Sequence, residues 1–218
     1  LPVVHLRGTN ILVKSFDADL ILDLIERERV TLFFGVPTMF QMLLESPGFA
    51  KTNFSSIRFL VSGGAPLPKR LIELYQAQKG IRLWEGFGLT GVGPNNFMAN
   101  GKPGTVGNPM PHVDVRVVDS QGREVPPGQD GELLIRGDHM CSGYWKKPEA
   151  TAEAIRGGWF HTGDLARIDE AALQLARLPD GHGSPRRIGF EDQADVHPSH
   201  VGLVVVEDPE KLELGDEV

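Results

Sequence analysis

The chain has 218 residues, of which 40% are hydrophobic, and it carries 22 Lys and Arg against 29 Asp and Glu. This composition is typical of a globular protein that folds as one large or two small domains. No apolar run approaches the ~18 residues of a membrane span, and no basic stripe is available for a phosphate backbone, so we expect neither a membrane span nor a nucleic-acid partner.

In the first hundred residues, strand patterns alternate with helical patterns. Asp17 is a plausible N-cap for a first helix, Pro68 suits the first turn of a third helix, and Gly80 suits its end. Such alternation implies a mostly parallel sheet with helices on both faces. Strands are expected at residues 10–13, 30–34, 57–61 and 81–84, and helices at 17–29, 38–45 and 68–78.

The pattern changes after about residue 100, where Gly and Pro separate short alternating strands at 114–119 and 132–136. Such spacing favours a smaller antiparallel, barrel-like β unit, and a short helix is expected at 148–155. We therefore expect an α/β fold with a partial parallel sheet followed by this β unit. The resulting domain boundaries are 1–100, 101–170 and 171–218.

The last segment is acidic, because residues 171–218 hold four Lys and Arg but ten Asp and Glu. A helix at 170–178 and a strand at 201–206 are expected within it. The single Cys141 excludes an internal disulfide and indicates a cytoplasmic location. Residues 1–8 lack the basic-then-apolar pattern of a signal peptide, and Leu1 is not an initiator Met. We therefore expect an internal fragment of a longer product.

Two glycine-rich loops follow expected strands. The first reads SGGAP at residues 62–66, between a buried strand and a helix, where open α/β sheets bind ligands. The second reads EGFGLTGVG at residues 85–93, where Phe87 can lie on a base and Thr90 can donate to a phosphate oxygen. Tight turns explain each loop taken alone, and Phe87 could simply pack, but two such loops on neighbouring strand ends favour a ligand.

A third segment, GWFHTGD at residues 158–164, ends in Asp164. A carboxylate can accept two hydrogen bonds from vicinal ribose hydroxyls, so Asp164 could bind a ribose. The alternative is that Asp164 is only a turn or helix-cap residue, since aspartate is common at such positions. We interpret His161 in this segment as a partly buried, hydrogen-bonded imidazole, and no histidine has spacing that indicates a metal site.

From about residue 10 to residue 170 the chain resembles the adenylate-forming (AMP-binding) acid–CoA ligase superfamily, and most of all its fatty-acid and acyl-CoA synthetases. Seven blocks in the family order carry the resemblance: FFGVPTMFQMLL, SIRFLVSGGAPLP, LWEGFGLTGVGP, KPGTVGNPMP, GREVPPGQDGELLIRG, CSGYWKKPEATAEA and GWFHTGDLARID.

The resemblance implies that a carboxylic acid, such as a fatty acid, reacts with ATP and Mg²⁺ to give acyl-AMP, whose acyl group then passes to coenzyme A. Thr90 would be catalytic through its contact with the phosphates, and Asp164 would bind the ribose. Residues 36–38 would border the acyl pocket. The other nucleotide contacts implied by position are Gly63, Gly64, Ala65 and Pro66 along the adenine, with Gly86, Phe87 and Gly88 in the second loop.

Several family features are missing. Gly91 stands where the family has the glutamate that helps to hold Mg²⁺, so magnesium binding is in doubt. The upstream phosphate loop, the hinge and the catalytic lysine of the C-terminal lid have no counterpart, and residues 171–218 are a divergent tail with a faint likeness to that lid. We therefore expect little or no turnover from the isolated chain, and self-association through an exposed sheet edge.

Two alternatives stay open at this point. One is a non-catalytic remnant that binds AMP or an acyl group. The other is a fragment of a peptide-synthetase adenylation domain, which would use a carrier protein in place of coenzyme A.

Overall fold

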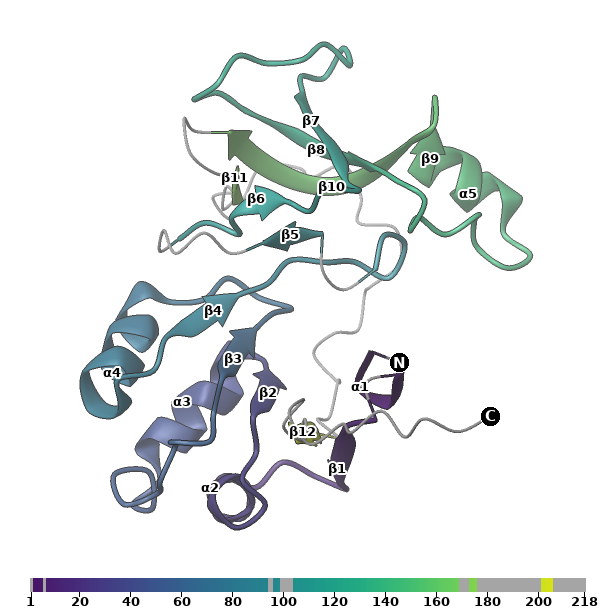
Figure 1. The fold of residues 1–218 in the computed structure, drawn as a ribbon. Coiled ribbons are helices and arrows are strands. Elements are labelled where there is room, and N and C mark those ends of the chain that lie inside the picture. The colour runs from purple at the N-terminus through teal and green to yellow at the C-terminus, as the bar shows by residue number, and fades with distance from the viewer. Residues whose placement is uncertain are drawn as a thin grey trace, which may run out of the picture. The chain divides into compact units, whose positions relative to one another are not determined.

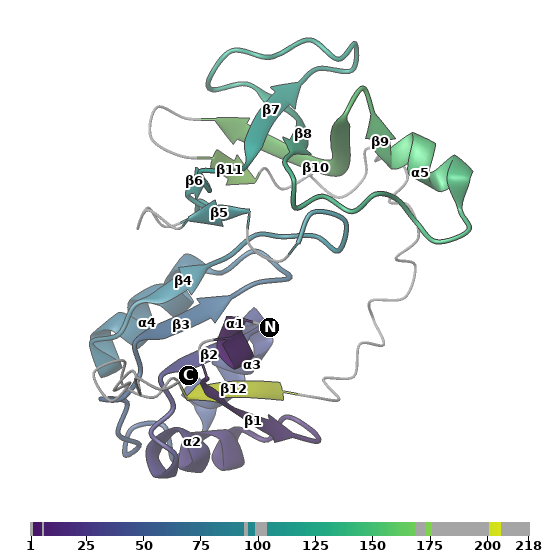
Figure 2. The same ribbon diagram turned by 45° about the vertical axis from the view of Figure 1, so that its right-hand side comes forward.

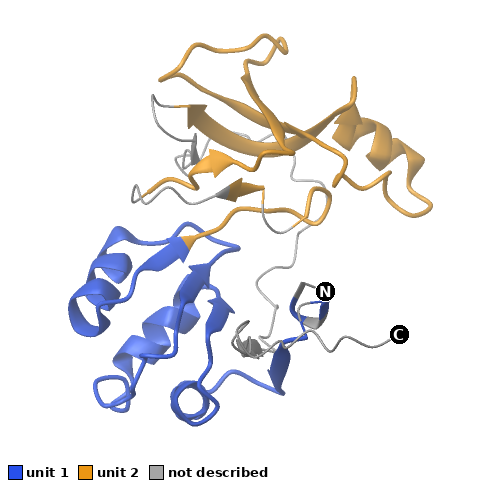
Figure 3. Ribbon diagram, in the orientation of Figure 1, with its two compact units in different colours: residues 1–84, 196–218 blue, residues 85–195 orange. Residues whose placement is uncertain are grey.

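The structure is a computed structural model that describes residues 2–5, 7–93, 96–98, 104–168, 173–175 and 201–205. The chain divides into two compact units (Figure 3), a first unit of Leu1–Trp84 with Val196–Val218 and a second unit of Glu85–Asp195. The domain boundaries expected from the sequence remain predictions. No helix in the described part of the chain is long and apolar enough to cross a bilayer.

A five-stranded sheet forms the centre of the first unit (Figure 1). Its strand order is β1 (Thr9–Val13), β12 (Val201–Val205), β2 (Leu32–Gly35), β3 (Phe59–Ser62) and β4 (Leu83–Glu85). The set β2, β3 and β4 is parallel, as the alternation of strands and helices predicts. The strand expected at the C-terminal end is confirmed as β12, which runs antiparallel to β1 and β2.

Three helices connect and cover these strands: α2 (Ala18–Arg27), α3 (Pro37–Glu45) and α4 (Lys69–Lys79). A single turn, α1 (Pro2–His5), precedes β1. The N-cap prediction for α2 is confirmed, because Asp17 Oδ1 accepts a hydrogen bond of 2.8 Å from Leu20 N. The end of α4 is also as predicted, with Gly80 in the left-handed region at a φ of +65°.

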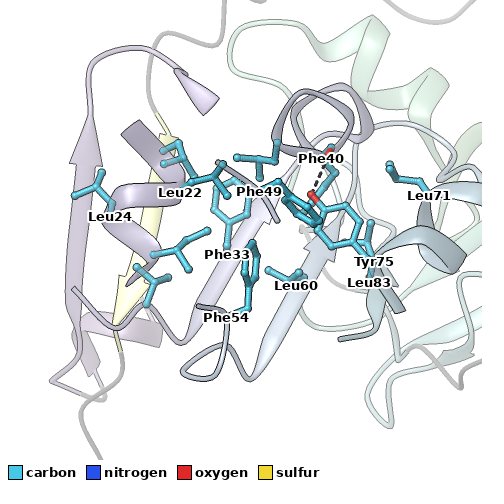
Figure 4. Packing of buried hydrophobic residues seen from close by; sticks show 14 of the residues in the cluster. Leu22, Leu24, Phe33, Phe40, Phe49, Phe54, Leu60, Leu71, Tyr75 and Leu83 are labelled. Atoms are coloured by element: carbon cyan, nitrogen blue, oxygen red, sulfur yellow. Dashed lines mark hydrogen bonds between the residues drawn. The ribbon is translucent and has the colours of Figure 1, made fainter. Parts of the chain in front are cut away.

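The helices pack against one face of the sheet (Figure 4). Phe33 and Leu60 are fully buried on that face, whereas their neighbours Phe34 and Phe59 are 51% and 47% exposed on the other. This differs from the expectation of helices on both faces. Successive strand residues point to opposite faces, so apolar side chains lie on both, but α2, α3 and α4 all pack into the core on the first face. Self-association of the chain remains a prediction.

Aromatic side chains join the helices at the centre of this core. The Tyr75 ring packs edge-on against Phe40 and Phe49, with centroids 5.7 and 5.1 Å away. Its hydroxyl donates a hydrogen bond of 2.9 Å to the Phe40 carbonyl, drawn as a dashed line in Figure 4. Burial raises the pKa of Tyr75 above its usual range, so the hydroxyl stays protonated and remains a donor.

The second unit is built on an antiparallel sheet with the order β11 (Leu173–Leu175), β10 (Trp159–Ile168), β8 (Asp130–Arg136) and β7 (Asp114–Val118). The short β9 (Ile155–Arg156) pairs with β10, and α5 (Pro148–Ala154) leads into it (Figure 2). A separate pair joins β5 (Phe97–Met98) to β6 (Asn108–Pro109). The expected antiparallel β unit is thereby confirmed.

The prediction of a helix at residues 170–178 is wrong for the residues at its centre. Leu173–Leu175 form β11, which pairs antiparallel with Ala166–Ile168 of β10. The free edge of β10 supplies backbone partners that local helix propensity does not take into account. The rest of that expected helix and the loop expected at residues 179–200 lie outside the described residues.

The last turn of α4 holds a loop in place through Lys79. Its ammonium donates to the carbonyls of Ala50 and Thr52, at 3.1 and 2.9 Å, and lies about 5 Å above the rings of Phe49 and Phe54. Burial lowers the pKa of Lys79, and the charge of Glu26 opposes this effect. The ammonium therefore acts as a bridge between α4 and the loop after α3.

We expect Lys79→Met to lower the free energy of unfolding by about 1–2 kcal/mol, because two carbonyls lose their donor. Urea denaturation measures the loss, and amide exchange in residues 46–54 locates it. The matched control is Lys69→Met on the first turn of the same helix, where an exposed 3.7 Å ion pair with Glu73 is lost. The control should change stability by less than about 0.5 kcal/mol. Equal effects of the two substitutions would contradict the bridging role.

Candidate nucleotide-binding site

The first loop extends the β2–β3 pairing by one residue beyond the strand. Gly63 N donates a hydrogen bond of 3.2 Å to the Gly35 carbonyl, and Gly63 is buried. Gly64 then turns away with a φ of +79°, which disfavours every residue with a Cβ. Gly64, Ala65 and Pro66 are exposed. The loop therefore exposes backbone that carries only small side chains at the carboxyl end of β3.

Ser62, the last residue of β3, has an unused polar group. Its side chain is fully buried, and its Oγ has no hydrogen-bond partner among the described residues. A buried hydroxyl without a partner costs about 1–3 kcal/mol. Because this oxygen is buried, it offers no exposed polar surface to a ligand in this conformation.

The second loop, residues 85–93, closes on itself within the second unit. Leu89 N donates to the Gly93 carbonyl and Val92 N donates to the Leu89 carbonyl, each at 3.1 Å. These bonds form a tight turn with Thr90 exposed at its tip. Gly86 and Gly88 are partly exposed. A hydroxyl at an exposed turn tip can donate to a phosphate oxygen.

Phe87 packs into the core of the second unit. Its ring is 8% exposed and meets Phe97 edge-on, with centroids 5.6 Å apart. Packing thus accounts for most of its surface, and a contact of Phe87 with a base remains a prediction.

Gly91 is buried directly against a ring of β10. A Cβ added at Gly91 would lie 2.3 Å from Cε2 of Phe160, well inside van der Waals contact. The Gly91 carbonyl also accepts a hydrogen bond of 2.8 Å from Cys141 N. Only a hydrogen atom fits at position 91 while Phe160 keeps its place, and this contact seats the second loop against β10.

The strand β10 carries Asp164 in a bulge. His161 pairs with Leu134 of β8, but Leu165 already pairs with Glu132. Three residues of β10, Thr162 to Asp164, therefore lie opposite one residue of β8. Such bulges bend a strand and redirect its side chains, so the carboxylate of Asp164 is presented by an irregularity inside a ten-residue strand.

Hydrogen bonds from β8 hold the bulge. The Thr162 hydroxyl donates to the Leu133 carbonyl at 2.7 Å and accepts from Asp164 N at 3.1 Å. Gly163, with a φ of +71°, donates its N–H to Glu132 Oε1 at 3.3 Å. Sequence reasoning missed Glu132, because it lies 31 residues before Gly163 and no motif links the two.

The hypothesis of a partly buried, hydrogen-bonded His161 is confirmed, since its side chain is 17% exposed. Its Nδ1 lies 2.7 Å from Arg156 Nη2 and 3.1 Å from Glu132 Oε2. Arginine can only donate, so Nδ1 accepts from Arg156 when it carries no proton and donates to Glu132 when it does. Both arrangements leave the imidazole engaged beside the bulge.

The residues present do not fit a magnesium ion at position 91. Gly91 supplies no carboxylate, and the Phe160 ring occupies the space into which a side chain would extend. Across the described ranges, no group of three His, Cys, Asp or Glu side chains is placed to hold a metal ion.

The predicted site residues thus divide between the units. The second unit brings the loop of Gly86, Phe87, Gly88 and Thr90 against β10, the strand that bears Asp164. The loop of Gly63, Gly64, Ala65 and Pro66 belongs to the first unit. That the three segments share one nucleotide remains a prediction.

Comparison with known proteins gives consistent matches. The family model described as "AMP-binding enzyme" matches residues 1–145. A feruloyl-CoA synthase from Amycolatopsis sp is 41% identical over 174 residues, covering 78% of this chain and 35% of that protein. A long-chain-fatty-acid–CoA ligase from Escherichia coli O6:H1 is 34% identical over 215 residues, covering 96% of this chain and 37% of that protein.

A solved structure agrees with these matches. The crystal structure of ATP-bound MatB from Rhodopseudomonas palustris superposes with a TM-score of 0.68 at 37% identity, covering 73% of this chain and 33% of that one. The chain therefore spans about a third of the length of the relatives it matches.

The contact between Gly91 and Phe160 predicts that Gly91→Ala destabilises the second unit by about 1–3 kcal/mol, through overpacking. Adding Phe160→Leu should recover part of this loss, so the double variant is less destabilised than the sum of the two single variants. Gly48→Ala is the control, since a Cβ there meets its nearest neighbour at an ordinary 3.4 Å. Urea denaturation of the four variants measures the coupling, and strict additivity would contradict the contact.

Proposed function

Because the chain belongs to the AMP-binding family of adenylate-forming acid–CoA ligases, we propose that it forms nucleotide-binding elements of an enzyme that activates a carboxylic acid with ATP. The observation that carries the proposal is the bulge of β10, which presents Asp164 on a strand that the glycine-rich second loop contacts. The activity of the whole enzyme is part of the proposal, since this chain covers about a third of its relatives.

Each segment has a role in this proposal that follows from its chemistry. The exposed backbone of Gly64, Ala65 and Pro66 lies along the adenine, because a flat ring can approach a backbone that lacks bulky side chains. The Thr90 hydroxyl donates to a phosphate oxygen, and Asp164 accepts from the ribose hydroxyls.

The reaction proposed for the whole enzyme has two steps. A carboxylate oxygen of the acid attacks the α-phosphorus of ATP, the bond to the β-phosphate oxygen breaks, and pyrophosphate leaves with acyl-AMP formed. The sulfur of coenzyme A then attacks the acyl carbon, its thiol proton is lost, and AMP leaves. We propose a fatty acid as the substrate, with residues 36–38 along its pocket; a long-chain-fatty-acid–CoA ligase is among the similar proteins.

The isolated chain is proposed to bind AMP but to turn over little. No carboxylate is available at position 91 to help neutralise the phosphates, and Phe160 closes that space. Losing one group that stabilises charge in a transition state typically costs about 3–4 kcal/mol. The same closure favours a second candidate function, a non-catalytic protein that binds AMP or acyl-AMP.

Asp164→Asn is expected to weaken AMP binding about 10–100-fold, because the site loses a charged hydrogen-bond acceptor. Isothermal calorimetry with AMP measures the change. The matched control is Asp130→Asn on the neighbouring strand, where Asp130 forms an exposed pair with Arg167 at 2.8 Å. The control should bind AMP within about twofold of the unchanged chain. If both substitutions weaken binding equally, Asp164 has no special role.

Acid-dependent pyrophosphate release should stay at background when the chain receives ATP, Mg²⁺ and a panel of fatty and aromatic acids. AMP binding without release supports an impaired or non-catalytic nucleotide binder. Release that rises severalfold above background with one acid would contradict the proposed impairment and would identify the substrate.

A further inference from the structure

Asn96 ties the two ends of the second loop together. Its backbone N donates to the Phe87 carbonyl and its Nδ2 donates to the Gly93 carbonyl, both at 3.0 Å. Its own carbonyl accepts from Met110 N at 2.9 Å, and the residue is fully buried. Asn96 therefore fixes the span on which Thr90 stands.

His139 completes this network from a distant part of the sequence. Its Nε2 lies 2.7 Å from Asn96 Oδ1, across 43 residues. Because the Asn96 amide nitrogen is directed to Gly93, the oxygen faces the imidazole and must accept. Nε2 of His139 therefore carries a proton and donates.

The other imidazole nitrogen of His139, Nδ1, favours the neutral form of the ring. His139 Nδ1 is buried and has no hydrogen-bond partner among the described residues. The neutral ring with its proton on Nε2 meets every contact, because Nδ1 then carries no proton. A second proton on Nδ1 would be a buried donor without an acceptor.

The segment that carries His139 contacts the loop a second time. Cys141, two residues further along, donates its N–H to the Gly91 carbonyl at 2.8 Å. The segment with His139 and Cys141 directly follows β8. It contacts the loop at Gly91 through Cys141, and it contacts the loop at Gly93 through His139 and Asn96.

We propose that Asn96 and His139 are positioning residues for the nucleotide-contacting loop, and that they hold Thr90 in its binding position through the neutral, Nε2-protonated form of His139. The inference rests on the proposed function for its effect on AMP, whereas the network itself is a property of the nucleotide-free chain. Neither residue touches the nucleotide; both act through the backbone of Phe87 and Gly93.

The charged and titratable groups near the ring make this network sensitive to pH. Burial lowers the pKa of His139 below its ordinary value of 6.5, the nearby His112 lowers the pKa further, and Asp138 opposes both effects. The His112 ring meets His139 edge-on at 5.3 Å. A lowered pKa favours the neutral form, so the network contributes fully above pH 6.5 and is lost as the pH falls through the pKa of the folded chain.

The test compares His139→Leu with His139→Gln at pH 7.5. Leu removes the donor to Asn96, and AMP affinity should fall about tenfold, whereas Gln can donate from its amide nitrogen and should restore affinity to within about threefold. Asn96→Leu should lower AMP affinity by as much as the double variant Asn96→Leu with His139→Leu, since the two residues act in one network. His112→Leu, the matched control, should leave AMP affinity within about twofold.

Two measurements on the nucleotide-free chain separate this inference from the proposed function. The amide exchange rates of Leu89 and Asn96 should rise about tenfold in His139→Leu. In His139→Gln they should return to the rates of the unchanged chain. The ¹⁵N spectrum of the unchanged chain at pH 7.5 should show His139 protonated on Nε2 alone. If the unchanged chain does not bind AMP, but the amide exchange and the ¹⁵N spectrum are as expected, only the proposed function is overturned.

Other outcomes overturn the inference. A proton on Nδ1 in place of Nε2 contradicts the network, even if the Leu variant fails to fold. Equal AMP affinity and equal amide exchange in the Leu, Gln and unchanged chains contradict the positioning role. An affinity loss in the Gln variant as large as in the Leu variant also contradicts it.

Discussion

The bulge of β10 is the constraint on which the candidate site depends. The strand pairs with β8 on both sides of the bulge, where Thr162 to Asp164 lie opposite the single residue Leu133. Gly163 accommodates the turn with a positive φ, and Glu132 receives its N–H. Because the sheet fixes both ends, the direction of Asp164 is set by paired strands rather than by a mobile loop. If Asp164 binds a ribose as proposed, this fixed backbone lowers the entropy lost on binding.

Packing links this strand to the second loop and also limits what the loop can do. Phe160 of β10 fills the space beside Gly91, so the loop is well seated but has no room for a metal-binding side chain. The same contact thus stabilises the conformation of the loop proposed to bind the nucleotide, and it argues against magnesium at position 91. Asn96 and His139 add polar contacts to the same loop, which makes it dependent on protonation as well as on packing.

The sequence predicted the features that depend on local patterns. The N-cap at Asp17, the end of α4 at Gly80, the parallel strands and the antiparallel β unit all follow from residue type and periodicity. It missed β11, the bulge and the contact of His139 with Asn96, which depend on partners far along the chain. The family motifs indicated Asp164, but only pairing with β8 shows how that residue is held.

We propose that both glycine-rich loops contact the same purine nucleotide. Photoaffinity labelling with 8-azido-AMP, followed by mass spectrometry of the labelled peptides, tests it most directly. If both loops contact the nucleotide, we expect labels in residues 62–66 and in residues 85–93, with both displaced by excess AMP in the same concentration range. Labels confined to one loop, or labels that AMP does not displace, would contradict it.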